Sequence, residues 1–186
     1  YVAQVDDPAH PDPQNKFWSD LQAELGEEAT SRLRSGFDGL IESSKASYVH
    51  RRFDLSYDAE NASSSAEPML LTHTDWYYFD PGSFDEAIAL AKEFKALWKK
   101  NKVDRSYRLY FGGVGTERPM FLVAQNAKSE SDYYSYAEER NAAMGEEPLN
   151  SLLSRLWAIT RKFEHSNSTL RPDLSNGEPA KILTAK

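Results

Sequence analysis

The chain has 186 residues, 40% of them hydrophobic, and a formal net charge of −7. This composition predicts a soluble globular protein with one sizeable core or two small ones, and no apolar run approaches the roughly 20 residues of a membrane-spanning helix. The negative charge disfavours nucleic acid as a partner. The absence of cysteine excludes disulfides and thiolate chemistry but leaves the compartment open between cytoplasm and a periplasmic or secreted location.

The first 56 residues predict a short strand, two helices and a closing strand. Tyr1–Val5 is extended, and apolar residues four apart indicate a helix from Phe17 to Leu25 that ends at Gly26. A loosely alternating strand is expected over residues 48–57. Between them we predict a second helix, whose inner face would carry Leu33, Phe37, Leu40 and Ile41.

Residues 57–68 are polar and serine-rich, which predicts a flexible linker. Strands and helices then alternate through residues 69–175, before a C-terminal tail at 176–186. Ser83 and Glu86 should form a capping box at the start of the first helix of this region. The predicted elements are strands at 69–79, 105–111 and 120–125, helices at 83–100, 132–144 and 148–163, and an extended segment up to residue 174.

This order of elements predicts an α+β fold. A strand, a helix, two strands joined by a hairpin, further helices and a last strand make the split βαβ pattern, in which four antiparallel strands form one sheet. The helices then cover one face of that sheet.

Parts of the sequence occur twice. Leu25-Gly26-Glu27-Glu28 returns as Met144-Gly145-Glu146-Glu147, and Asp54-Leu55-Ser56 returns at the same spacing as Asp173-Leu174-Ser175. Val2-Ala3-Gln4 has a third echo at 123–125, two residues out of step. The repeat predicts a partial first copy over residues 1–56 and a complete second copy over 69–175, with the leading half of the first copy expected upstream of Tyr1.

The second copy also resembles a known group of proteins. The segments Asp80–Glu86, Tyr107–Tyr110 and Ala127–Tyr134, followed by Gly145-Glu146-Glu147, are similar to the dimeric α/β-barrel superfamily of ferredoxin-like domains. The resemblance implies two such sheets packed face to face around an enclosed space, either in a homodimer or between tandem copies. It does not imply one activity, because the superfamily holds monooxygenases, haem-degrading enzymes, dehydratases and uncharacterised proteins.

The best candidates for chemistry lie on the strand at 69–79. The period of two places His73, Asp75 and Tyr77 on one face of that strand. A histidine beside an aspartate can shuttle a proton, so His73 and Asp75 are the candidate catalytic pair. The structural alternative is a hydrogen-bonded polar pair at the seam between two sheets, without catalytic function.

Arg108 and Tyr110 share a face of the next strand and are candidate ligand-binding residues together with Tyr77. Arg108 would hold a carboxylate and Tyr110 would donate a hydrogen bond. An Arg–Asp pair that ties the sheet together is the alternative. We expect these residues to line one cavity with His73 and Asp75 only if all four face the same side of the sheet.

Three functions remain open on this sequence. The first is a small-molecule-binding protein with an aromatic-lined cavity between two antiparallel sheets, whose ligand would be small and hydrophobic or aromatic. The second is a cofactor-independent monooxygenase- or isomerase-like enzyme with His73 as base. The third is a non-catalytic interaction or assembly domain. No cofactor is predicted, because Gly112-Gly113-Val114-Gly115 lacks a following helix. No metal is predicted either: His73 and Asp75 are the one place where a single-metal site could be built, and the other histidines, His10, His50 and His165, have no second ligand at metal spacing and are expected to be exposed to solvent.

Overall fold

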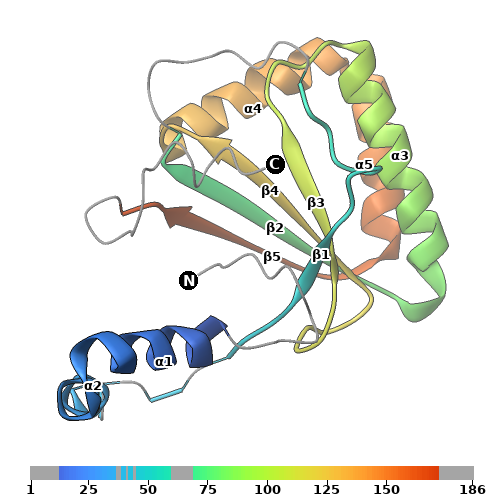
Figure 1. Ribbon diagram of the computed structural model, residues 1–186. Helices are drawn as coiled ribbons and strands as arrows, with labels where there is room; N and C mark the ends of the chain where they lie inside the picture. Colours follow the sequence, from blue (N-terminus) through green and yellow to red (C-terminus); the bar gives the residue numbers. More distant parts are fainter. Residues whose placement is uncertain (1–12, 37–38, 41, 44, 60–68, 172–186) are drawn as a thin grey trace. The chain divides into compact units, whose positions relative to one another are not determined.

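The computed structural model describes residues 13–36, 39–40, 42–43, 45–59 and 69–171. It divides the chain into two compact units, residues 1–45 and 46–186. The smaller unit holds α1 (Pro13–Leu25) and α2 (Glu27–Ser35). The larger unit (Figure 1) holds β1 (Val49–Arg51), β2 (Leu71–Phe79), a 3-10 turn (Pro81–Ser83), α3 (Phe84–Lys100), β3 (Tyr107–Gly112), β4 (Met120–Ala127), α4 (Glu130–Met144), α5 (Glu146–Ile159) and β5 (Thr160–Thr169). None of the described helices is long and apolar enough to cross a membrane.

A glycine with positive φ joins the two helices of each helical pair. Gly26 has φ 84° between α1 and α2, and Gly145 has φ 82° between α4 and α5. Both positions strongly favour glycine, because other residues rarely adopt this backbone conformation. Two acidic residues follow each glycine and lie at the positive end of the next helix, as the sequence predicts.

The second helix of the smaller unit is shorter than predicted. α2 ends at Ser35, and Leu33 and Leu40 are 45% and 75% exposed. The expected apolar face is therefore not buried at these two positions, and Phe37 and Ile41 lie outside the described residues. Thr30 is the buried residue of α2, and its hydroxyl donates to the Gly26 carbonyl at 2.9 Å.

The five strands form one antiparallel sheet in the order β1-β3-β4-β2-β5. α3 connects β2 to β3, which lie on either side of β4, and β5 pairs with the other side of β2. This is the connectivity of the split βαβ pattern, with β1 as an additional edge strand. The predicted α+β class and antiparallel sheet are confirmed, and Figure 1 shows α3, α4 and α5 on one side of it.

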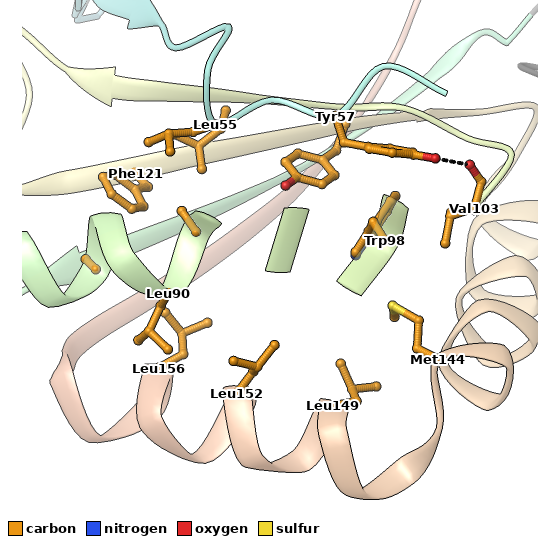
Figure 2. Packing of buried hydrophobic residues seen from close by; sticks show 14 of the residues in the cluster. Leu55, Tyr57, Leu90, Trp98, Val103, Phe121, Met144, Leu149, Leu152 and Leu156 are labelled. Atoms are coloured by element: carbon orange, nitrogen blue, oxygen red, sulfur yellow. Dashed lines mark hydrogen bonds between the residues drawn. The ribbon is translucent and has the colours of Figure 1, made fainter. Parts of the chain in front are cut away.

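The segment before the predicted linker belongs to the larger unit, and so does Tyr57 at the linker's start, which is buried and bridged to Tyr107. The boundary between the units falls between Lys45 and Ala46, whereas the repeat groups residues 46–56 with the first copy. The reason is packing: Leu55 is fully buried in the core of the larger unit, and the Tyr57 hydroxyl donates to the Val103 carbonyl at 2.8 Å (Figure 2). Residues 60–68 and 172–186, with most of the predicted linker and the tail, lie outside the described residues.

Two local predictions are wrong. The helix expected up to Phe163 ends at Ile159, because the following residues pair with β2 as β5. Arg161 and Lys162 tolerate a helix, but the ladder of backbone hydrogen bonds overrides that preference. Ser83 precedes α3 without accepting a side-chain capping bond, whereas Ser129 caps α4 by accepting from the Asp132 amide.

The main core lies between the sheet and the three helices. Aromatic rings contribute much of it: Phe121 packs against Phe79 and Phe111 with ring centroids 4.8 Å apart, and Trp98 meets Tyr107 edge-on at 4.7 Å. The fully enclosed residues of this layer, seen in part in Figure 2, include Leu55, Phe79, Ala87, Leu90, Leu109, Phe121 and Met144.

We expect Leu90→Ala to lower the free energy of unfolding by about 3 kcal/mol, because Leu90 is fully enclosed and its truncation leaves a cavity. Urea unfolding followed by circular dichroism measures the change. Val114→Ala is the control, because Val114 is 76% exposed and should lose less than about 0.5 kcal/mol. Equal losses in the two variants would contradict the placement of the core.

Candidate functional site

Alternate side chains of β2 face opposite sides of the sheet, as the alternation along the strand predicts. Tyr77 and Phe79 pack with the helix-covered core, whereas Trp76 and Tyr78 belong to a separate apolar cluster on the opposite face. His73 lies on the helix side, where its ring stacks on Tyr133 of α4 with centroids 4.0 Å apart. The candidate catalytic pair therefore lies between the sheet and α4.

His73 is held by hydrogen bonds at both ring nitrogens. Nε2 lies 3.0 Å from Asp75 Oδ1, and Nδ1 lies 2.7 Å from Asn167 Oδ1. The Asn167 amide nitrogen donates to Glu130, which turns its oxygen toward the histidine. Asp75 and Asn167 therefore hold the imidazole ring from both sides. The ring is 5% exposed, so no nitrogen remains to face a bound molecule.

Asp75 has one oxygen engaged and one free. Oδ1 faces His73, and Oδ2 accepts no hydrogen bond from a described residue. Burial raises the pKa of Asp75, and this outweighs the opposing effect of the neighbouring His73, His165 and Arg140 side chains. Its side chain is 14% exposed, so the free oxygen is within reach of a small molecule. A carboxyl group in these surroundings is a candidate proton donor or acceptor.

Arg140 of α4 supplies a cation next to this carboxyl group. It donates to Gln125 Oε1 at 2.9 Å and to the Asn141 side chain, but forms no ion pair with a described residue. Burial lowers the pKa of Arg140. Half-buried cations normally have an acidic partner, so this guanidinium is suited to an anionic group of a ligand. The polar cluster comprises His73, Asp75, Gln125, Tyr133, Arg140, His165 and Asn167.

Tyr77 lies beside the polar cluster, in an aromatic group at the β5 edge. Its ring is 5.0 Å from Phe163 and 5.9 Å from Trp157, centroid to centroid. Burial, reinforced by the charge of Asp75, raises the pKa of Tyr77, which therefore stays protonated. Its place next to Asp75 is compatible with the predicted ligand contact.

Arg108 and Tyr110 lie on the other face of the sheet, so the expectation of one cavity shared with His73 and Asp75 is wrong. The register places Tyr107 opposite Gln125, and Gln125 opposite His73, so these three share the helix side. Arg108, one residue later, points away from the helices and donates to Asn126 Oδ1 at 2.7 Å. No Arg–Asp pair forms there; the cross-strand partner is an amide.

The face opposite the helices carries its own apolar group, the open-face cluster. No helix residue of the described part of the larger unit belongs to it. Tyr78 donates to Glu164 at one end of this face, where burial and that carboxylate raise the pKa of Tyr78 to about 12. The members of the open-face cluster are Val49, Trp76, Tyr78, Tyr110, Met120, Leu122 and Ala124.

Sequence reasoning missed most of the polar cluster. His165 is exposed, as predicted, but its place beside His73, with the two rings 6.0 Å apart, was not foreseen. Tyr133 and Arg140 are seven residues apart, the spacing of one helix face, and this was the available signal. Among the described residues, no group of three His, Cys, Asp or Glu side chains could hold a metal ion. The hollow in the smaller unit, lined by Leu25, Glu28, Ala29, Arg32 and Leu33, contains none of the predicted residues.

Comparisons with known proteins are sparse. No protein-family model and no curated protein matches the chain. A solved structure described as a crystal structure study of an anthrone oxidase-like protein is similar, with 16% identity and a TM-score of 0.44 over 86% of this chain and 72% of that one. A likeness at this TM-score carries no argument about this chain.

We expect Asp75→Asn to gain stability relative to the natural chain as pH rises above about 4. A raised pKa means that the folded state holds the proton more tightly than the unfolded chain. The natural chain therefore loses stability as pH rises from the ordinary pKa of an aspartate to the raised pKa of Asp75. The variant lacks this loss. Urea unfolding at several pH values between 3 and 7 measures the difference.

Asp132→Asn is the matched control, with the opposite sign. The Arg105 guanidinium beside Asp132 lowers the pKa of Asp132. The stability that Asp132 contributes is therefore present above the ordinary pKa of an aspartate and is lost as pH falls below it. That variant should therefore lose most at neutral pH. Parallel trends in the two variants would contradict the burial effect at Asp75.

Proposed function

We propose that this protein binds a small, flat, largely apolar molecule against the open face of its sheet, in an aromatic-lined cavity closed by a second sheet of the same kind. The observation that carries the proposal is the open-face cluster, an aromatic and aliphatic group on the side away from α3, α4 and α5, in which Trp76 and Tyr110 are half-buried and Tyr78, Met120, Leu122 and Ala124 are buried. A sheet with helices on one side leaves such a face for another layer or a ligand.

The side chains of the open face change in size along the strands, which suits a planar ligand. One row across β2, β4 and β3 contains Trp76, Leu122 and Tyr110. The next row contains Thr74 and Ala124, whose side chains are small, and ends in Arg108. A flat ring over the small pair would contact the aromatic row at its edge.

Two arginines give this face a preference for an acidic group. Arg108 lies at the end of the small row, and Arg51 of β1 lies opposite Tyr110 in the register, with Nη2 3.5 Å from the carboxylate of Asp58. Nε of Arg51 is buried without a hydrogen-bond partner. An unsatisfied buried donor costs about 1–3 kcal/mol, which a carboxylate or phenolate oxygen would offset. The proposed ligand is therefore an aromatic molecule with an anionic substituent.

The probe for this site is 8-anilinonaphthalene-1-sulfonate, which is flat, aromatic and anionic. We expect the natural chain to bind it with an increase in fluorescence, and Trp76→Ala to bind it about tenfold more weakly, because an aromatic contact is lost. Trp157→Ala is the matched control, because Trp157 lies in α5 on the helix side.

Both variants should show the circular dichroism spectrum and melting curve of a folded chain, because a partly unfolded protein also binds this dye. If Trp157→Ala loses the probe and Trp76→Ala keeps it, the ligand lies on the helix side and the proposal is wrong.

A second candidate is a cofactor-independent enzyme that moves a proton at the polar cluster. The free Oδ2 of Asp75 favours it, with the roles of the two predicted catalytic residues exchanged. Asp75 would exchange a proton with the substrate, His73 would hold it in position, and Arg140 would stabilise a developing oxyanion. An isomerase- or monooxygenase-like reaction on an acidic aromatic substrate has these requirements.

The probe for this second candidate is 4-nitrophenol, followed by calorimetry between pH 4 and 6. A phenol donates to a carboxylate, so its affinity should rise as Asp75 loses its proton and should not vary with pH in Asp75→Asn. Asp132→Asn is the control and should retain the dependence. A pH dependence that survives in Asp75→Asn would exclude this role for Asp75.

A further inference from the structure

β5 is a long edge strand with its outer side open. Its ten residues, all except Arg161 at a bulge, pair with β2 alone, and all of them except Thr160 are exposed. No described residue forms a backbone hydrogen bond to the outer side of β5. β1, at the opposite edge, has only three residues. An exposed strand edge is a template for pairing with another strand, and proteins usually shorten or cover it.

The hydrogen-bond pattern with β2 limits how a second strand can pair. The Leu170 amide donates to the Leu70 carbonyl, and in an antiparallel ladder every second pair is bonded in this way. The even residues of β5 therefore bond to β2, and Phe163, His165 and Asn167 direct their backbone groups outward. In an antiparallel pair of two copies related by a twofold axis, residues whose backbone groups point outward must lie opposite each other. The twofold axis therefore passes through one residue position of β5 and not between two neighbouring positions.

Charge then selects one register among these. Within one chain Lys162 already lies 3.2 Å from Glu164 and 3.7 Å from Glu117. With the axis at Phe163, Lys162 of each copy also lies opposite Glu164 of the other, which extends these pairs across the interface, and opposite charges in cross-strand positions are stabilising. With the axis one residue earlier or later, Lys162 or Glu164 would face itself. An axis at His165 places Ser168 and Ser166 opposite the two charges, without any attraction.

The aromatic residues beside this edge support the same axis. Phe163 is 37% exposed and Trp157 is 47% exposed, and their rings are 5.2 Å apart. With the axis at Phe163, the two copies of this residue would meet, flanked by both Trp157 rings. Exposed aromatic side chains at the centre of a contact are typical of protein interfaces.

We propose that the chain forms a twofold dimer in which β5 pairs antiparallel with β5 of a second copy about Phe163, so that two five-stranded sheets become one. This interface uses the β5 edge of each sheet and no residue of the open-face cluster. It is therefore independent of the proposed ligand site, and either can fail without the other.

The absence of cysteine allows a direct test of the register. Phe163→Cys in the full chain should be joined to itself by a short bismaleimide cross-linker, because residues on the axis of a hydrogen-bonded antiparallel pair have Cα atoms about 5.5 Å apart. His165→Cys and Asn167→Cys are the controls and should cross-link at least tenfold more slowly. Faster cross-linking at either control, or none at all three positions, would overturn the proposal.

The charges provide a second test that does not depend on a new cysteine. Lys162→Glu and Glu164→Lys should each weaken the dimer at least tenfold in sedimentation velocity, because like charges then face each other. An equimolar mixture of the two single variants should regain the dimer, since both cross-strand pairs are again of opposite sign. A natural chain that is monomeric at high concentration, or a mixture that does not associate, would overturn the proposal.

Discussion

The rest of the larger unit depends on the two backbone ladders of β2. This strand is bonded to β4 on one side and β5 on the other, so it cannot slip without breaking both ladders. A slip by one residue would move His73 and Asp75 to the open face and Trp76 to the helix face. Such a change would leave charges against an apolar cluster, which is why the register is strongly specified.

The polar cluster connects α4 to three strands. Glu130 and Asn167 hold His73 from α4 and β5, and Arg140 holds Gln125 of β4. Each bond crosses from one element to another, so the partners are satisfied only when all the elements are in place. The cluster therefore favours one position of α4 on the sheet, at the energetic cost of burying the Asp75 carboxyl group.

The sequence allowed the order of elements and the faces of β2 to be predicted, because a period of two is a local property. It did not show which side chains of β3 lie on the same face of the sheet as His73. That depends on the register between β3 and β4, which the hairpin between these two strands sets. The end of α5 was misplaced for the same kind of reason: pairing with β2, not local preference, extends the chain from Thr160. Arg140 escaped notice because α4 has charged and aromatic residues around its whole circumference, so its inner face is not evident.

The segment from Ala46 to Tyr57 packs into the core of the larger unit and precedes most of that unit in the chain. It contributes β1 and the enclosed Leu55, and Ser56 accepts from the Leu109 amide at 3.0 Å. These contacts are non-covalent and lie on the N-terminal side of residues 60–68. A chain cleaved within that stretch would thus stay assembled, with its N-terminal fragment bound to the remainder like a tight peptide ligand, and the two pieces could be made separately and recombined.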